Sequence, residues 1–413
     1  MHPKADLSVN FCGIKCENPF FLSSSPVSNT AEMCERAYNY GWGGIVYKTL
    51  NLEEKFKIVM PSPRLSCLHY EDKRFVGLQN AEQITDRPIK DNLADIARLK
   101  KQFPKKVLVS SIMGFVDEDW ALLAKMSEDA GADMIELNFS CPQMARRDAG
   151  YRVGQDYSSV EHFTECVKKA SNLPVMAKMT PNITDMIPVA LAAKRGGANA
   201  ISAINTIRSI TDIDIEKCVP LPSIHDHSAI TGFSGAAAKP VALRFVSELH
   251  NCKELSLPIS GIGGIVTWKD ALQFTLLGAT TVQVTTAVMR YGYRIVEDMI
   301  EGLSDHMIDH KISSLDEIKG AAAARLVDPS ELNCRFQVVS SIDEDKCIGC
   351  GQCLISCSDG ANKAIQFDVE KRKAKVDEEK CVGCLLCKHV CPVWDCISHK
   401  EVDTKTHKHA AIM

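Results

Sequence analysis

Hydrophobic residues between position 19 and about position 290 fall into short runs that alternate with amphipathic stretches. Eight runs have the length and composition of buried strands, and they lie at residues 20–23, 44–48, 107–111, 134–138, 175–178, 200–204, 258–261 and 281–284. Stretches between them space their apolar residues as helices do, for example 120–130, 160–170 and 187–196. This alternation predicts an α/β protein with a (β/α)8 (TIM) barrel, and a doubly wound open sheet is the alternative.

Glycines support the barrel. Gly131, Gly197 and Gly278 each follow a helical stretch and precede a predicted strand, and a glycine in that place commonly ends a helix. No Gly-x-Gly-x-x-Gly motif follows the first run, so a Rossmann dinucleotide site is not supported.

Two predicted connections, 49–92 and 206–238, are much longer than the others. Connections of this length in a compact domain are usually functional or disordered. Both leave from the carboxyl ends of predicted strands, where a barrel builds its active site. We therefore expect them to form lid or substrate loops.

After residue 340 the pattern changes, and cysteine dominates. A motif C-x2-C-x2-C-x3-C occurs twice at a constant offset, with cysteines at Cys347, Cys350, Cys353 and Cys357, then at Cys381, Cys384, Cys387 and Cys391. In bacterial-type ferredoxins three cysteines of one motif hold a cluster and the fourth holds the other cluster.

The duplication therefore predicts a 2[4Fe–4S] ferredoxin domain. One cluster takes Cys347, Cys350, Cys353 and Cys391, and the second takes Cys381, Cys384, Cys387 and Cys357. Paired zinc knuckles are the alternative, which the third cysteine of each motif disfavours. Pro392 follows Cys391 as the ferredoxin pattern requires, whereas Ser358 follows Cys357; proline is not a ligand, so we expect both clusters to bind.

These patterns predict the domain organisation. Residues 1–310 form the barrel, 311–340 a linker, 341–400 the ferredoxin domain and 401–413 a tail with solvated histidines. Within the ferredoxin domain, 364–369 and 373–376 flank a charged turn and predict a β-hairpin. Cys396 belongs to neither cysteine motif, and we interpret it as a packed thiol.

Bulk composition narrows the function. The 413 residues carry a net charge of −4, which gives no electrostatic case for nucleic acid or an anionic membrane. No apolar run is long enough to span a membrane, and the N-terminus lacks the apolar core of a signal peptide, so we expect a cytoplasmic protein. Abundant cysteine without a secretion signal indicates metal or redox chemistry before disulfides.

The stretch 136–143 concentrates candidate chemistry at the end of the fourth run. Asn138 and Cys141 come directly after the apolar residues, and Pro142 prevents a regular element from continuing. Cys141 is placed as a proton donor beside a substrate. An inert buried thiol is the alternative.

A flavin is the cofactor that best suits this combination, because it exchanges single electrons with clusters and hydride with a substrate. Gly263 and Gly264 follow the seventh run, and Thr285 and Thr286 follow the eighth, which is the usual phosphate position of a barrel.

Strand-end side chains complete the predicted site. Lys48 and Lys178 would stabilise negative charge on a reduced flavin, and a structural ion pair with a carboxylate such as Glu136 is the alternative.

Asparagines end strands or loops at Asn80, Asn138 and Asn205. Amides both donate and accept, which matches the alternating N–H and C=O groups of a pyrimidine, although asparagine is also a common turn residue.

Several motifs together resemble a known family. The barrel resembles those of class 1 dihydroorotate dehydrogenases and dihydropyrimidine dehydrogenases at residues 77–80, 138–142, 177–182, 205–206, 234–235, 261–264 and 283–286. With the ferredoxin repeat behind it, nearly the whole chain is similar to the FMN and iron–sulfur subunits of bacterial NAD-dependent dihydropyrimidine dehydrogenases.

This resemblance implies roles for single residues. Cys141 would be the general acid/base. The pyrimidine would be bound by Asn80, Asn138, Asn205 and Thr206. FMN would be contacted by Ser24, Lys48, Thr49 and Lys178 around the ring, and by Gly235, Gly263, Gly264, Thr285 and Thr286 around the ribityl phosphate.

The resemblance also implies a mechanism and partners. Electrons would pass through two [4Fe–4S] clusters to FMN, which would deliver hydride to C6 of uracil or thymine while Cys141 protonates C5. A second subunit with FAD and the NAD(H) site would complete a hetero-oligomer that contains a homodimer of this chain. A dihydroorotate dehydrogenase with a fused ferredoxin and a non-catalytic electron-transfer module remain the alternatives.

Overall fold

The computed structural model describes residues 5–52, 54–55, 57–141, 150–334 and 336–402. The chain forms two compact units that divide between Leu326 and Val327, within the predicted linker, and each unit is described by itself. Pro142 and Gln143 of the central stretch, and the predicted tail beyond residue 402, lie outside the described residues.

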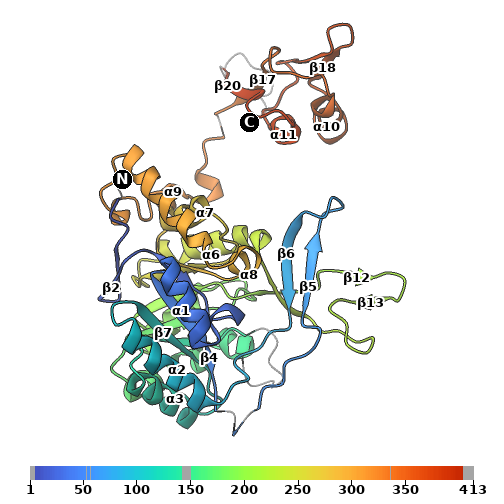
Figure 1. Cartoon of the computed structure of the whole chain (residues 1–413). Coiled ribbons are helices and arrows are strands. Elements are labelled where there is room, and N and C mark those ends of the chain that lie inside the picture. Colours follow the sequence, from blue (N-terminus) through green and yellow to red (C-terminus); the bar gives the residue numbers. More distant parts are fainter. Residues whose placement is uncertain (1–4, 53, 56, 142–149, 335, 403–413) are drawn as a thin grey trace. The chain divides into compact units, whose positions relative to one another are not determined.

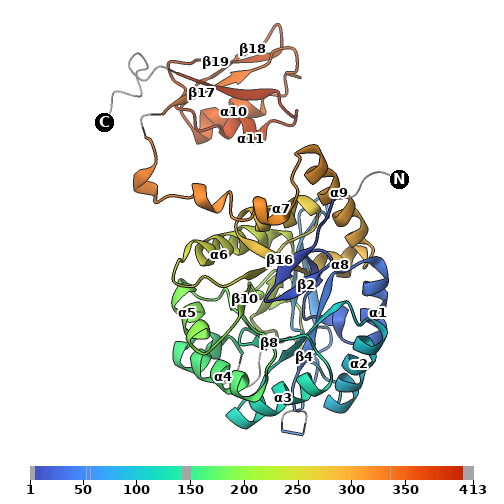
Figure 2. The same cartoon turned by 90° about the vertical axis from the view of Figure 1, so that its left-hand side faces the viewer.

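The first unit is a closed barrel of eight parallel strands, as predicted (Figure 2). In order around the barrel these are β3 (Phe20–Leu22), β4 (Gly44–Leu50), β7 (Val107–Ile112), β8 (Met134–Asn138), β9 (Val175–Lys178), β10 (Ala200–Ala203), β15 (Ile259–Ile262) and β16 (Ala279–Val284). Strand β16 pairs with β3 and closes the ring. Each strand overlaps one of the eight predicted runs.

Helices surround this ring in the alternation that the sequence predicted (Figure 2). They are α1 (Ala31–Tyr40), α2 (Ile89–Gln102), α3 (Asp117–Asp129), α4 (Tyr157–Ala170), α5 (Ile187–Arg195), α6 (Lys239–Asn251), α7 (Trp268–Leu276), α8 (Thr286–Tyr291) and α9 (Ile295–Asp309). Gly131, Gly197 and Gly278 have φ of +91°, +97° and +110°, which confirms their place at helix ends.

The core of the barrel unit lies between strands and helices. Most strands are covered on both faces, so strands such as β3 are apolar without alternation and completely buried. Large side chains such as Trp42, Trp120 and Phe245 are buried in the same core. Each contributes about 1.5–3 kcal/mol relative to an exposed position. A short hairpin of β1 (Val9–Phe11) and β2 (Ile14–Cys16) precedes the barrel.

The two long connections fold together. Strands β5 (Leu65–His69) and β6 (Phe75–Asn80) come from the first, and β11 (Ile207–Ser209) and β14 (Thr231–Ser234) from the second. They form one antiparallel sheet in the order β11-β14-β6-β5 beside the barrel (Figure 1).

A side-chain bond joins two strands of this sheet, because Gln79 Nε2 donates to Thr231 Oγ1 at 2.9 Å. The second connection also contains the small ribbon β12 (Ile213–Asp214) and β13 (Val219–Pro220).

Residues 312–326 belong to the barrel unit. The segment contains short 3-10 turns at Leu315–Glu317 and Ala323–Arg325. Backbone N–H groups of Gly320 and Ala322 donate to the carbonyls of Thr275 and Leu276, at 3.0 and 2.9 Å. These bonds fix the segment against the end of α7.

The second unit is small. It contains a 3-10 turn (Pro329–Glu331), β17 (Val338–Ile342), α10 (Gln352–Gly360), β18 (Ile365–Asp368), β19 (Lys373–Val376), α11 (Leu386–Val390) and β20 (Ile397–Glu401). Strand β17 pairs with β20, and β18 pairs with β19 in the predicted hairpin. In the part of the chain that the structure describes, no helix is both long and apolar enough to cross a membrane.

Candidate functional site

A cavity opens at the carboxyl ends of the barrel strands, bordered by the loops after them and by the joint sheet of the two long connections. All the barrel residues that the sequence predicted for the site line this cavity: Ser24, Lys48, Thr49, Asn80, Asn138, Cys141, Lys178, Asn205, Thr206, Gly235, Gly263, Gly264, Thr285 and Thr286. The fold therefore brings together residues that are up to about 260 positions apart in the sequence.

A chain of hydrogen bonds crosses one wall of the cavity. The Oγ1 atom of Thr49 lies 3.0 Å from Ser24 Oγ and accepts a hydrogen bond from Asn138 Nδ2 at 2.9 Å. The Asn138 oxygen accepts from the backbone N–H and the hydroxyl of Ser140 at 3.2 and 3.1 Å, and Ser140 Oγ accepts from Asn205 Nδ2 at 2.8 Å. Each amide therefore has a fixed orientation in the wall.

The remaining predicted substrate residues are held by backbone contacts. Asn80 Nδ2 donates to the carbonyl of Gly232 across the joint sheet at 3.1 Å. The backbone N–H of Thr206 donates to Asn205 Oδ1 at 2.7 Å. Together these contacts place amide groups from the joint sheet and from two barrel loops around one space.

Lys48 forms a buried ion pair, the alternative considered for it, with a carboxylate that the sequence analysis did not name. Its Nζ contacts Glu82 Oε1, and the two side chains are 3% and 10% exposed. Arg64 Nε lies 3.3 Å from the other oxygen of Glu82. Burial lowers the pKa of Lys48, and the Glu82 carboxylate opposes that shift. Glu82 follows Asn80 by two residues, and a lone charge in a loop carried no signal of this role.

Lys178 lies near the buried carboxylate of Glu136, the structural ion-pair partner considered in the sequence analysis. Its Nζ is 3.8 Å from Glu136 Oε1 and 3.4 Å from Ser23 Oγ. Glu136 Oε2 accepts from Ser202 Oγ at 3.0 Å and Gln283 Nε2 at 3.4 Å. Both lysines thus have a carboxylate partner and also line the cavity, so the two interpretations coexist.

A polar atom in a residue that lines the cavity lacks a hydrogen-bond partner among the described residues. It is the amide oxygen of Gln283, a residue that is 1% exposed. A buried polar atom without a partner costs about 1–3 kcal/mol. A ligand with N–H or O–H donors fits such positions.

The predicted phosphate grip consists of tightly packed glycines. A Cβ on Gly264 would lie 2.7 Å from the backbone nitrogen of Lys239, and a Cβ on Gly235 would lie 2.9 Å from Gly77 Cα. Gly235, Gly263 and Gly264 all have positive φ. Thr286 begins α8, so its N–H has no acceptor within its own helix. Close backbone approach and N–H groups at a helix start are the features that a flavin phosphate requires.

Cys141 lies in the loop after β8 and is 5% exposed. It packs with Ile58, Ile84 and Met113 in a small apolar cluster. The backbone N–H of Tyr151 donates to the carbonyl of Cys141 at 3.0 Å. The thiol is therefore both packed and part of the cavity lining, as a proton donor shielded from water would be.

The duplicated cysteines surround two further small cavities in the second unit. Cys347, Cys350, Cys353 and Cys391 line one of them. Cys357, Cys381, Cys384 and Cys387 line the other. Each cavity thus takes three cysteines from one motif and one from the other, the same grouping as the sequence predicted. Other lining residues are mainly apolar, which suits a cluster held by sulfur.

Hydrogen-bond donors point at several of these sulfur atoms. The backbone N–H of Ser340 lies 3.4 Å from Cys381 Sγ, and that of Ala364 lies 3.2 Å from Cys357 Sγ. Such donors stabilise thiolate sulfur and influence the potential of a cluster. Burial raises the pKa of Cys353 to about 11. Cys396 is 2% exposed and lines the first of the two cavities as a fifth cysteine.

Family comparisons agree with this architecture. Residues 6–307 match the family described as dihydroorotate dehydrogenase, and residues 340–399 match the 4Fe-4S dicluster domain. The chain therefore belongs to the dihydroorotate dehydrogenase family of oxidoreductases, with an iron–sulfur domain after the barrel.

Individual relatives are similar over most of their length. The chain is 52% identical over 401 residues to the NAD-dependent dihydropyrimidine dehydrogenase subunit PreA of Escherichia coli (strain K12), which covers 97% of both chains. It is 36% identical over 326 residues to the chloroplastic dihydropyrimidine dehydrogenase (NADP(+)) of Arabidopsis thaliana, 76% of both chains. It is 37% identical over 319 residues to the catalytic subunit of dihydroorotate dehydrogenase B (NAD(+)) of Pyrococcus horikoshii, 77% of this chain and 98% of that one.

Proposed function

We propose that this chain is the catalytic subunit of an NAD-dependent dihydropyrimidine dehydrogenase that interconverts uracil or thymine with the 5,6-dihydropyrimidine. The observation that carries the proposal is one cavity that combines three asparagine amides with Cys141, in a chain that also carries two cysteine tetrads. The similarity over 97% of the chain to a protein of that name supports it.

Two kinds of cofactor fit the chain. FMN, when bound, supplies hydride exchange with the pyrimidine and single-electron exchange with the clusters. Gly235, Gly263, Gly264, Thr285 and Thr286 would hold its phosphate, and Ser24, Lys48, Thr49 and Lys178 would lie around its ring. The tetrads Cys347, Cys350, Cys353 and Cys391, and Cys357, Cys381, Cys384 and Cys387, would each hold a [4Fe–4S] cluster.

The asparagines bind and orient the substrate. A pyrimidine-2,4-dione presents two N–H donors and two carbonyl acceptors along its edge, and each amide offers both complementary groups. Because the amides of Asn138 and Asn205 are fixed through Ser140, the ring is held in one orientation. A fixed orientation lowers the entropic part of the barrier.

Cys141 holds and delivers the proton at C5. Addition of hydride at C6 leaves negative charge on C5 and the neighbouring carbonyl, and water is excluded from a buried loop. The thiol is the proton donor placed in that wall of the cavity. Lys48 and Lys178 supply positive charge that favours the reduced, anionic form of a ring beside them.

A partner subunit would feed electrons to the chain. The E. coli relative is named as a subunit and the P. horikoshii relative as a catalytic subunit. This sequence has no dinucleotide-binding fingerprint after its first strand. We propose that the partner carries FAD and the NAD(H) site, and that a homodimer of this chain lies in the hetero-oligomer.

The test is anaerobic chemical reduction of the purified protein, followed by a stopped-flow screen for flavin reoxidation. We expect uracil and thymine to reoxidise the flavin and orotate to do so much more slowly. Reoxidation by orotate alone would favour the dihydroorotate dehydrogenase reading, and reoxidation by no pyrimidine would favour a non-catalytic electron-transfer module.

A further inference from the structure

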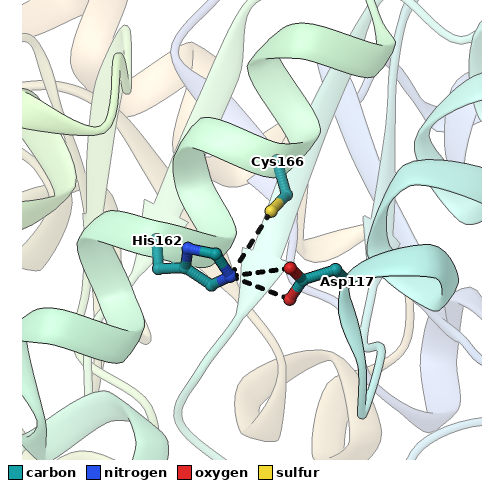
Figure 3. A group of neighbouring side chains, drawn as sticks. All are labelled: Asp117, His162 and Cys166. Carbon is teal, nitrogen blue, oxygen red and sulfur yellow. Dashed lines mark hydrogen bonds and ion pairs between the residues drawn. The ribbon is translucent and has the colours of Figure 1, made fainter.

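Three side chains of different chemistry converge on the outer surface of the barrel, away from the residues that line the cavity. They are Asp117, the first residue of α3, and His162 and Cys166 on α4 (Figure 3). Their ligand atoms all lie within 4.8 Å of one another. His162 and Cys166 are one helical turn apart, so both project from one face of α4.

The geometry of the contacts decides what this group can do. Both Asp117 oxygens lie 2.8–2.9 Å from His162 Nε2, and Cys166 Sγ lies 3.8 Å from the same nitrogen. A nucleophilic relay needs its base to contact the acid and the thiol through opposite ring nitrogens. Here both partners face one nitrogen, which is the arrangement of ligands around a shared centre (Figure 3).

We propose that Asp117, His162 and Cys166 form a binding site for a zinc-class divalent cation. Thiolate and imidazole ligands select zinc, cobalt or nickel over magnesium or calcium. Bond lengths of about 2.0–2.3 Å place tetrahedral zinc ligands about 3.3–3.6 Å apart. The N–S separation is close to that spacing, and the exposed Asp117 side chain needs to withdraw by only about half an ångström. Water takes the fourth position.

The surroundings support a prepared site. Neighbouring charges on α4 have their own partners, since Lys169 pairs with Glu165 and Arg195 pairs with Glu161. Among the described residues, no lysine or arginine forms an ion pair with the Asp117 carboxylate.

The backbone beneath the group is also fixed. Trp120 of α3 stacks on Phe163 of α4, with ring centroids 5.5 Å apart.

The experiment uses the cofactor-loaded full chain, so that the cluster cysteines are occupied. Zinc binding is measured by equilibrium dialysis with elemental analysis for the wild type, His162→Ala, Cys166→Ser and Asp117→Asn. Loss of a ligand should weaken one zinc site by more than about 100-fold, because loss of an outer-shell partner alone costs about 10–100-fold. Cys218→Ser, an exposed cysteine elsewhere, and His310→Ala, from the stacked pair His306 and His310, should leave this site unchanged.

A second readout reports on Cys166 itself. Zinc should slow the alkylation of Cys166, followed by peptide mass spectrometry, in the wild type but not in His162→Ala, and magnesium should have no effect in either. All three ligands are at the surface or half-buried, so the variants should fold. Equal zinc affinity in the wild type and His162→Ala, or alkylation that zinc does not affect, would show that the group is only a hydrogen-bonded surface cluster.

Discussion

The barrel and the cysteine-rich unit differ in what fills their cores. The barrel core is made of large apolar side chains that pack without a ligand, among them Trp42, Phe20 and Phe274. In the smaller unit half of the ten fully buried core residues are cysteines, and the others are small or medium, such as Val339 and Ala374. We therefore infer that the first unit folds without a ligand in its cavity. The second unit needs its iron–sulfur clusters to complete its core.

The small size of the second unit increases its dependence on a bound cluster. The regular elements of the second unit span residues 338–401. Domains of about 60 residues bury only about 60% of the surface of the unfolded chain and are marginally stable without a metal or disulfides. Metal binding and folding are then the same event.

The largest expected effect is a selective collapse of the second unit. Cys387→Ala removes one ligand of a proposed cluster, and we expect residues 338–401 to become protease-sensitive while the barrel stays folded. Limited proteolysis with mass spectrometry, together with iron and sulfide analysis, measures both. Eight irons and eight sulfides per chain are expected for the wild type from two four-iron clusters.

Cys396→Ala is the matched control for that variant. It removes a buried cysteine of the same core that lies outside both proposed tetrads. We expect full iron content and a stability loss of about 1 kcal/mol, the typical cost of a core truncation by one atom. Loss of a cluster in Cys396→Ala would contradict the ligand assignment.

The next effect concerns catalysis on the finished fold. Cys141→Ala should keep flavin, clusters and pyrimidine binding but lose about 10²–10⁴-fold in turnover, the usual contribution of a positioned general acid. Cys141→Ser should recover little of it, because a hydroxyl is a far weaker acid than a thiol with a reference pKa of about 8.5. Single-turnover flavin oxidation by uracil measures the rate.

Cys34→Ala separates catalysis from packing. Cys34 is a completely buried thiol on α1 and does not line the cavity. We expect it to lower the melting temperature and to leave the rate per folded molecule unchanged. A wild-type rate in Cys141→Ala would mean that the thiol is only a packing residue.

A third, smaller effect tests the glycines that are proposed to hold the flavin phosphate. Gly264→Ala forces a Cβ to within 2.7 Å of the Lys239 backbone at a φ of +74°, so the loop has to move. Gly13→Ala has a similar φ of +83° but no atom within 4 Å. Strain alone costs about 1–3 kcal/mol in either variant. Only Gly264→Ala should also lower the affinity for FMN, measured by fluorescence titration of the apoprotein.

The smallest effect is a pH dependence confined to the barrel unit. Burial, with a smaller contribution from Lys319, lowers the pKa of His250 below its usual 6.5. The unfolded chain then binds more protons below that value, so the stabilising contribution is present above pH 6.5 and is lost as the pH falls through the folded pKa. His250→Gln should flatten the slope of urea stability below pH 6.5, whereas His225→Gln, at an exposed histidine of the same unit, should not.

Much of this architecture was predictable because the responsible patterns are local. Strands buried on both faces are continuous apolar runs, and the eight runs marked the eight barrel strands. The fixed spacing of the cysteines is also a local pattern, and it predicted which four cysteines would lie around each of the two small cavities. Barrel topology then carries side chains at strand ends to one rim, which is why Asn138, Lys178 and Thr285 could be expected together.

The unpredicted parts depend on contacts between distant segments. Strands β11 and β14 have only three and four residues, too few to show alternation, and the joint sheet exists only through pairing across the two connections. The role of Glu82 as the ion-pair partner of Lys48 was not predicted, because only the folded chain brings the two residues together. Residues 312–326 are held by backbone bonds to Thr275 and Leu276 and by buried side chains such as Leu315, and these contacts exist only once the barrel has formed.

The joint sheet has a consequence for how the chain folds as it is made. Strand β6 finds its partner β14 only after about 150 further residues have been synthesised, as the pairing of Asn80 with Gly232 shows. Such distant pairings form late, because the entropy of closing the loop is lost before the contact forms. A nascent chain that ends before β14 holds Asn80 at the end of the β5–β6 hairpin, followed by Glu82, while the neighbouring strand β14 is still missing. The proposed substrate wall can therefore assemble only after more than two thirds of the first unit has been translated.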